Sequence, residues 1–434
     1  LSPGLILLNW RGNQKGILAM AAPKALVGFH VLFRRLAGPS GQAAWRVALP
    51  ILMVVAGLVM SRLPLEFEFP SDGELDVHQT VYYREGPLAT TKVYWDPQTT
   101  ERLMSVDGIV IGGTGFTEFK QLLLAHLPKL LLKDVSTELS VGLGSGMLAG
   151  ESALHPRVRE ITAVEIEPSV IEGAVYFSRQ NHAVLENPKL TVINDDIGNF
   201  LRTRSTRFQV ISADEKTADD YASNGFSYSL EYYALLRARL APGGLVAQWV
   251  PTTLPPVQYR MILNTFAQSF PHIQLWYFLP AYKRGPINTL LIGSGKRIHL
   301  DLDHIHQEFR KNRPAYQELR PYGLTSAEAL LPHFIADETV LRPAVEAAPI
   351  NSLEHPRYEF YQPWDYARDR QEKFIENHEF LLDLRQQAGH EFLVNLELNQ
   401  QEKARFERTF AAEDLYLKGF LGFLRGDSLA EQYQ

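Results

Sequence analysis

The pattern of hydrophobic and polar positions divides the chain into four regions. Near the N-terminus one long run is almost wholly apolar, and after it apolar and polar residues alternate with a period of two. Further along, short apolar strands alternate with segments of helical period, and the last third of the chain is polar and helical. These patterns predict a membrane-associated segment (1–66), a small β-sheet domain (67–118), a doubly wound α/β domain (119–298) and a helical C-terminal extension (299–434).

The apolar run near the N-terminus is VALPILMVVAGLVM, Val47–Met60, with Arg46 and Arg62 on either side. A membrane-spanning helix needs about 20 apolar residues, and flanking residues extend this run to 43–62. A buried helix is the alternative, which Pro50 supports. Because the run shows no amphipathic period, we expect a membrane helix, and the run lies too far along the chain to be a cleaved signal peptide.

Strands and helices alternate regularly in the central region. Its expected strands are ELSVGL, ITAVEIE, LTVIND, FQVISA and GLVAQWV, each followed by a helical segment. This order is typical of a mostly parallel sheet with helices on both faces. The next two strands, IQLWYFL and NTLLIGS, are joined by a short loop, so we expect them to pair antiparallel. Before this region, the alternating stretches TVYYREGPLATTKVYW and ERLMSVDGIVIGG predict a small antiparallel sheet.

Composition narrows the class of protein. The 434 residues are 45% hydrophobic and 21% charged, which excludes a disordered chain. The absence of cysteine excludes disulfide scaffolds, thiolate zinc sites and cysteine nucleophiles. A net charge of −6 gives no sign of a nucleic-acid binder. His304 and His306 are two residues apart on an expected helix and do not share a face, so we predict ordinary surface histidines and no metal site.

The segment VGLGSG follows the first strand of the α/β series. Its glycines, Gly142, Gly144 and Gly146, allow a tight turn and a close approach of the backbone to a ligand. Met147 stands where the dinucleotide-binding pattern G-x-G-x-x-G requires glycine, whereas G-x-G-x-G is the pattern of adenosylmethionine-dependent folds. The predicted fold is therefore a Rossmann-like doubly wound sheet of the adenosylmethionine-dependent methyltransferase type.

Acidic residues follow the next three strands at the same predicted edge. Glu165, about 20 residues after the glycine turn, is placed to accept both ribose hydroxyls of a nucleoside. Asp196, with Asp195 beside it, is placed to receive the amine of adenine, although two adjacent acids could instead cap a helix. Asp214 could act as a general base or as a helix N-cap. The long polar loop after it suggests a lid over the substrate.

Residues 82–294 resemble the spermidine synthase family of aminopropyltransferases, and more closely a bacterial branch in which this domain follows membrane helices. The similarity runs through YYREGPLAT, QLLLAHLP, VGLGSG, VEIEPSVIE, SYSLEYYALLRARLAPGG and QWVP. It implies transfer of an aminopropyl group from decarboxylated S-adenosylmethionine to putrescine or a related amine. Members of this family commonly pair, so a homodimer is a further expectation.

The resemblance assigns roles to individual residues. Asp214 would deprotonate the attacking amine, and Gln121 would join the glycine turn in holding the cofactor. Glu165 would take the ribose and Asp196 the adenine. Tyr282, in the segment AYKRG, would contact the amine substrate.

The chain departs from the family's pattern around the amine. Ser145 stands where the family has an aspartate facing the aminopropyl nitrogen, Thr217 replaces a second aspartate, and Lys120 replaces a tyrosine. These changes remove negative charge that a dication such as putrescine requires in a desolvated pocket. Asp219 and Asp220, in the polar loop, could replace it.

Two other functions stay open at this level. The missing acid at Ser145 and the presence of Lys120 would admit the carboxylate of ordinary S-adenosylmethionine, which favours a methyltransferase. A non-catalytic nucleoside-binding module of a membrane protein is the second alternative. Asp214 argues against it, because a pure binder needs no base beside its nucleoside site.

Basic residues near the apolar run favour its N-terminal side, which by the positive-inside rule places most of the chain outside the cell. The nucleoside cofactor is a cytoplasmic compound and is the stronger argument. We therefore expect a protein of the bacterial inner membrane with its catalytic domain in the cytoplasm. Because residue 1 is leucine, we also expect the chain to be a processed product or part of a longer protein.

Overall fold

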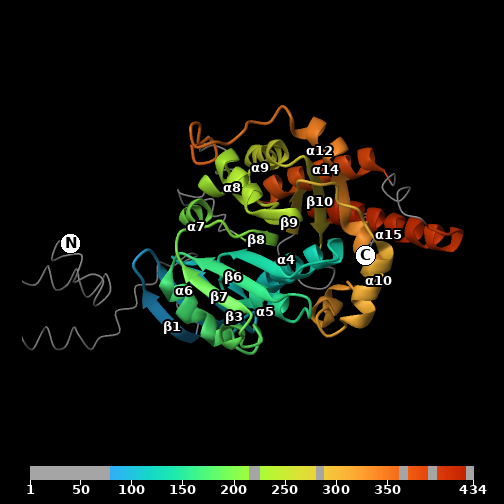
Figure 1. Cartoon of the computed structure of the whole chain (residues 1–434). Coiled ribbons are helices and arrows are strands. Elements are labelled where there is room, and N and C mark those ends of the chain that lie inside the picture. Colours follow the sequence, from blue (N-terminus) through green and yellow to red (C-terminus); the bar gives the residue numbers. More distant parts are fainter. Residues whose placement is uncertain (1–78, 215–224, 280–287, 361–369, 390–397, 427–434) are drawn as a thin grey trace, which may run out of the picture.

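The computed structural model describes residues 79–214, 225–279, 288–360, 370–389 and 398–426 (Figure 1). The predicted membrane helix at 43–62 lies outside these residues. Within the part of the chain that is described, no helix is both long enough and apolar enough to span a bilayer. The expected localisation at a membrane is corrected to this extent: the described part of the chain gives it no support.

The first four strands form a small antiparallel sheet, as the alternating pattern predicts. They are β1 (Gln79–Glu85), β2 (Thr90–Asp96), β3 (Glu101–Val106) and β4 (Ile109–Gly113), paired in that order. Val93 and Met104 on its buried face pack against Val170 of α6 (Pro168–Gly173) and against Phe177. This contact fixes the small sheet to the main domain beside the predicted cofactor site.

The main sheet has eight strands, in the order β12-β10-β11-β9-β8-β5-β6-β7. Its strands are β5 (Thr137–Val141), β6 (Glu160–Glu165), β7 (Leu190–Asn194), β8 (Phe208–Ala213), β9 (Leu240–Pro251), β10 (His272–Phe278), β11 (Asn288–Ser294) and β12 (Phe334–Asp337). The five strands β5 to β9 pair parallel. As predicted, β10 and β11 pair antiparallel, and β11 is also antiparallel to β9.

Helices cover both faces of the main sheet (Figure 1). The remaining α-helices are α4 (Glu118–Leu131), α5 (Met147–Ala153), α7 (Ile197–Thr203), α8 (Leu230–Ala238), α9 (Pro256–Ser269), α10 (Leu302–Lys311), α11 (Ala327–Leu330), α12 (Glu338–Val345), α14 (Arg370–Ala388) and α15 (Gln400–Arg425). Short 3₁₀ helices are η1 (Gly115–Thr117), η2 (Ala174–Phe177), η3 (Val184–Glu186), η4 (Phe226–Tyr228), η5 (Gln317–Tyr322) and η6 (Leu331–His333).

Alternate residues of the central strands supply two separate cores. On β8, Val210 belongs to the core under α4, α5 and α10, whereas Ile211 belongs to the core under α7, α8 and α9. Such alternation follows from the period of two along a strand. A strand buried on both faces therefore has apolar residues at adjacent positions, as Val210 and Ile211 are in FQVISA. The predicted doubly wound α/β fold is confirmed.

The C-terminal region contributes a strand as well as helices. The short strand β12 pairs with β10 and forms one edge of the main sheet. Arg385 of α14 donates to the carbonyls of Pro332 and Phe334 and pairs with Asp414 of α15. The buried guanidinium of Arg385 thus connects α14 and α15 to the edge strand β12. The C-terminal region therefore shares the core of the α/β domain.

Candidate active site

The predicted site residues follow β5, β6, β7 and β8 at one edge of the sheet. Val141 pairs with Val164 on one side and with Ala213 on the other, and Glu165 pairs with Asn194. The carboxyl ends of these parallel strands therefore meet along one line. Ligands of open α/β sheets bind beyond this edge.

The glycine turn lies directly after β5. Gly142, Gly144 and Gly146 all have positive φ, at +82°, +54° and +79°. Residues with a Cβ rarely adopt such backbone conformations, so the turn favours glycine at each place. Behind it, the amide of Asn181 donates to the carbonyl of Ser145 over 2.9 Å, which fixes the end of the turn from the protein side.

Glu165 is buried at the end of β6 and contacts the glycine turn. Its Oε2 accepts the N–H of Leu143 at 2.9 Å and that of Gly144 at 3.5 Å, and its Oε1 accepts the N–H of Glu167 at 3.1 Å. Burial raises the pKa of Glu165, and the backbone N–H groups partly oppose the rise. Acid and turn thus form one rigid unit, in which the carboxylate still has acceptor capacity for a hydroxyl group.

Asp196 is the N-cap of α7, since its Oδ1 accepts the N–H of Asn199 at 2.9 Å. The helix-cap alternative is therefore realised. Asp195 accepts both from the N–H of Asp196 and from the side chain of Asn199. Asp196 is exposed, and among the described residues no donor contacts its Oδ2, so the cap does not prevent it from contacting a ligand.

Gln121 lies on α4 and is buried against the glycine turn. Its Oε1 accepts a hydrogen bond from the hydroxyl of Ser145 over 3.0 Å. A Cβ on Gly112 of β4 would lie 2.9 Å from the Gln121 amide and 3.3 Å from the Ser145 hydroxyl. The small sheet therefore lies close over this side of the turn, and a side chain at position 112 would displace the amide of Gln121.

Asp214 follows β8 and is held in an ion pair. The ammonium of Lys120, on α4, lies 2.8 Å from its Oδ1, and both side chains are largely buried. Lys120 also lies over the indole of Trp249, 4.2 Å from the ring centroid, on β9. The sequence identified Lys120 and QWVP as motif positions but did not indicate that α4 and β9 would bring them to the carboxylate.

Three predicted substrate contacts cannot be placed. Asp219, Asp220 and Tyr282 lie outside the described residues, as does the greater part of the polar loop after Asp214. Within the described part, the structure brings Gln121, the glycine turn and Glu165 into contact. It sets Asp214 at the end of the strand on the other side of β5.

A row of histidines behind the site was not indicated by the sequence. His182 and His126 each contact Glu151 of α5, at 2.7 and 3.0 Å, and His126 contacts His155 at 2.9 Å. These residues lie far apart in the chain, so no local spacing could reveal them. A second omission is Ile166, an exposed apolar side chain directly after Glu165.

The two histidines of α10 have different surroundings. His304 is buried, and its Nε2 lies 2.9 Å from the carbonyl of Lys129, so the prediction of a surface histidine is wrong for this residue. His306 lies 3.7 Å from Glu328. Among the described residues, no group of three or more potential ligand side chains could hold a metal ion.

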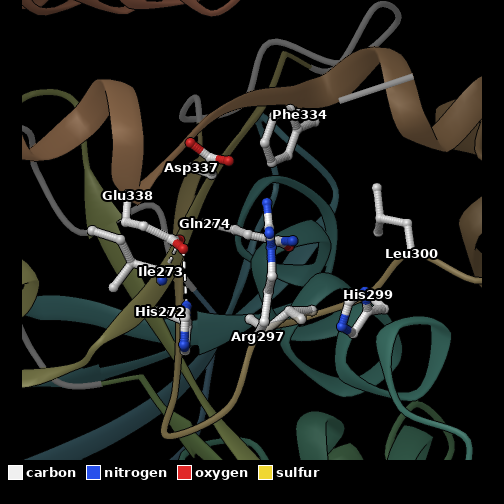
Figure 2. Close-up of a pocket in the computed structure, with 10 residues that line it drawn as sticks. His272, Ile273, Gln274, Arg297, His299, Leu300, Phe334, Asp337 and Glu338 are labelled. Carbon is white, nitrogen blue, oxygen red and sulfur yellow. Dashed lines mark hydrogen bonds and ion pairs between the residues drawn. The ribbon is translucent and has the colours of Figure 1, made fainter. Parts of the chain in front are cut away.

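A cavity of about 300 Å³ lies at the opposite edge of the sheet (Figure 2). Its wall includes His272, Gln274, Arg297, Asp337 and Glu338, and Figure 2 shows the ion pair between His272 and Glu338. Strand register pairs His272 with Ser294, which in turn pairs with Leu245 at the start of the buried part of β9. The cavity is therefore separate from the glycine turn.

Comparison with known proteins gives one consistent result. The model of the spermine/spermidine synthase domain matches residues 118–301. Spermidine synthase of Dictyostelium discoideum is 29% identical over 265 residues, which are 60% of this chain and 90% of that protein. A spermidine synthase crystallised with the transition-state analogue AdoDATO aligns with a TM-score of 0.48 and 18% identity, over 57% of this chain and 89% of the other.

Polyamine aminopropyltransferase 1 of Pseudomonas aeruginosa is 30% identical over 218 residues, which are 48% of this chain and 74% of that relative. The glycine turn, Glu165 and Asp214 all lie within residues 118–301, which the spermine/spermidine synthase domain matches. This chain belongs to the spermidine synthase family of polyamine aminopropyltransferases and is a transferase.

Proposed function

We propose that this chain transfers an aminopropyl group from decarboxylated S-adenosylmethionine to putrescine or a related amine. Two curated relatives are named for aminopropyl transfer or spermidine synthesis. They favour this reaction over methyl transfer and over a non-catalytic nucleoside-binding module. The local observation that carries the proposal is the position of Glu165, the last residue of β6, and of Asp214, directly after β8, because these two strands flank β5 and its glycine turn.

The nucleoside end of the donor belongs at β6 and β7. Glu165 keeps acceptor capacity for the ribose hydroxyls, and the glycine turn leaves room for the backbone to approach the ligand. Asp196 would accept the adenine amine through the oxygen that does not cap α7. Exposed Ile166 would cover one face of the base with apolar surface. Gln121 would hold the cofactor from α4.

The reacting end of the donor belongs between the glycine turn and Asp214. The acceptor nitrogen attacks the methylene carbon bound to the sulfonium, so an N–C bond forms and the C–S bond breaks. The bonding pair goes to sulfur, which leaves as a neutral thioether in methylthioadenosine. The new ammonium loses a proton to Asp214. Because the leaving group is already activated, orientation and one base are sufficient.

The amine's remaining contacts are assigned from sequence alone. Asp219, Asp220 and Tyr282 would hold the far part of the acceptor. Neither the formation of the N–C bond nor the proton transfer to Asp214 depends on these three residues.

The test is a turnover assay with a binding control. Wild-type protein, Asp214→Asn and Asp134→Asn would each be incubated with decarboxylated S-adenosylmethionine and putrescine, and methylthioadenosine would be measured. Asp134 is an exposed aspartate in the loop after α4, away from the glycine turn, so it is a matched control. We expect Asp214→Asn to lower kcat by about 10²–10⁴. Methylthioadenosine, titrated calorimetrically, should bind all three proteins equally.

Methyl transfer from ordinary S-adenosylmethionine without aminopropyl transfer would overturn the proposal. So would binding of methylthioadenosine with no transfer to any amine.

A further inference from the structure

The ion pair between Lys120 and Asp214 differs from an ordinary surface pair. The ammonium is 2.8 Å from the carboxylate and stands over Trp249, and Lys120 and Trp249 are both almost fully buried. Desolvated pairs of this kind hold each partner firmly, because separating them leaves an uncompensated charge in the protein. Lys120 of α4 is thus a permanent counter-ion of the carboxylate that follows β8.

Within the described residues, no second carboxylate forms an ion pair with this cation. From α4 the next side chain toward the turn is uncharged Gln121, the turn itself contributes Ser145, and β9 contributes Trp249. Glu165 accepts the N–H groups of Leu143 in the turn and of Glu167 after β6. Among the residues that the structure describes, Asp214 is the carboxylate in an ion pair with Lys120.

A protonated acceptor would meet an unfavourable environment there. Its ammonium would lose hydration, approach Lys120, and find a carboxylate that already has a counter-ion. A like charge nearby disfavours the charged form of a bound group. The uncharged amine has no such cost, and it carries the free electron pair that the reaction needs.

We propose that the ammonium of Lys120 occupies the place beside Asp214 that a protonated acceptor amine would otherwise take. This chain therefore binds its acceptor amine in the uncharged form. This inference rests on the proposed function and makes Lys120 a specificity-determining residue. The uncharged nitrogen attacks the methylene carbon, the C–S pair goes to sulfur, and the proton of the new ammonium passes to Oδ2 of Asp214. Oδ1 is the oxygen that Lys120 contacts.

The first test is the pH dependence of kcat/KM for putrescine between pH 7 and pH 9.5. Alkylammonium groups have pKa values of about 10.4, so the uncharged fraction grows about tenfold for each pH unit. Wild-type kcat/KM should rise by nearly the same factor. In Lys120→Met, Asp214 is free to bind the ammonium, so KM at pH 7 should fall about tenfold or more and the pH dependence should flatten.

Two further variants separate charge from packing. Lys120→Arg keeps the cation and should keep the steep pH dependence, whatever its kcat. Lys133→Met removes an exposed lysine just after α4, where it pairs with Asp301, and should behave as wild type. An equal or higher KM in Lys120→Met at pH 7, with methylthioadenosine still bound normally, would overturn the inference.

A binding measurement keeps this result distinct from failure of the proposed reaction. Putrescine would be titrated calorimetrically into protein saturated with methylthioadenosine, at pH 7 and pH 9.5. We expect wild type to bind more tightly at the higher pH and Lys120→Met to bind more tightly than wild type at pH 7. Absence of turnover with this binding pattern would refute the reaction alone, whereas identical binding by both proteins would refute the role of Lys120.

Discussion

The carboxylate of Glu165 accepts the backbone N–H of Leu143 at 2.9 Å, which ties the end of β6 to the glycine turn after β5. Its other oxygen accepts the N–H of Glu167. One buried acid therefore shapes the turn and faces the proposed ribose position. Loss of its charge should affect both stability and ligand binding.

Glu165→Gln tests this double role. The amide can present only one acceptor oxygen, so at least one backbone N–H loses its partner, at a cost of about 1–3 kcal/mol. We expect the affinity for methylthioadenosine to fall about tenfold or more, measured by calorimetry. Glu160→Gln, at the exposed start of the same strand, is the control and should change neither quantity. An affinity within twofold of wild type would argue against the ribose role.

The backbone of the glycine turn gives a second prediction. In Gly146→Ala the positive φ of +79° costs about 1–2 kcal/mol, and the new Cβ would lie 3.0 Å from the amide of Asn181. We expect chemical denaturation to show that loss, with weaker nucleoside binding. Gly295→Ala is the matched control, because no heavy atom lies within 4 Å of its added Cβ. Equal losses in the two variants would contradict the prediction.

A second ion pair on α4 is structural. The ammonium of Lys129 donates to Glu138 at 2.7 Å and to Ser152 at 2.8 Å, all fully buried. Burial lowers the pKa of Lys129, and Glu138 opposes that change. Lys129→Met should lower the unfolding free energy by about 3–5 kcal/mol, since Glu138 is left unpaired.

The double variant Lys129→Met/Glu138→Leu should regain most of that loss, because no buried charge remains. A double-mutant cycle from urea denaturation measures the coupling. Additive losses from the two single variants would show that the pair is not coupled.

The buried histidines predict a pH dependence of stability. Burial lowers the pKa of His155, with the nearby His126 acting in the same direction. In the unfolded chain His155 binds a proton near pH 6.5, while in the folded protein it stays neutral. The unfolded state therefore gains protons as the pH falls below about 6.5, and stability declines by up to about 1.4 kcal/mol per pH unit.

His155→Phe removes this contribution. Between pH 6.5 and pH 5 its unfolding free energy should fall less steeply than that of wild type, whatever its absolute stability. His299→Gln changes an exposed histidine and should keep the wild-type slope. Parallel slopes for wild type and His155→Phe would show that His155 titrates alike in both states.

The fold was largely accessible from the sequence, because each strand of the main sheet except one has its own apolar run and turn signals. The exception is β12, whose four residues lie between helices and become a strand only by pairing with β10. A segment this short carries no period that could be recognised. The polar helices α14 and α15 likewise gave no sign that they share the main core.

The structure brings the glycine turn, Glu165 and Asp214 to one edge of the sheet, and the roles assigned to them stay predictions. Gly142, Glu165 and Asp214 each end or follow a parallel strand, and parallel strands bring their carboxyl ends to one edge. For Asp196 the sequence left a helix cap and a ligand contact both open, and the structure shows the cap. His304 was misassigned to the surface because one residue's burial depends on which helix face meets α4.

By itself the sequence determined the order of strands and helices, the glycine turn and the acids at the strand ends. These features depend on local conformation and on the period of a few residues. Only the tertiary structure decided that the proposed base, Asp214, lies in an ion pair. Lys120 and Asp214 are 94 residues apart, and their contact depends on how α4 packs across the ends of β8 and β9. No local pattern records that packing, because it is the joint result of two cores and eight strands.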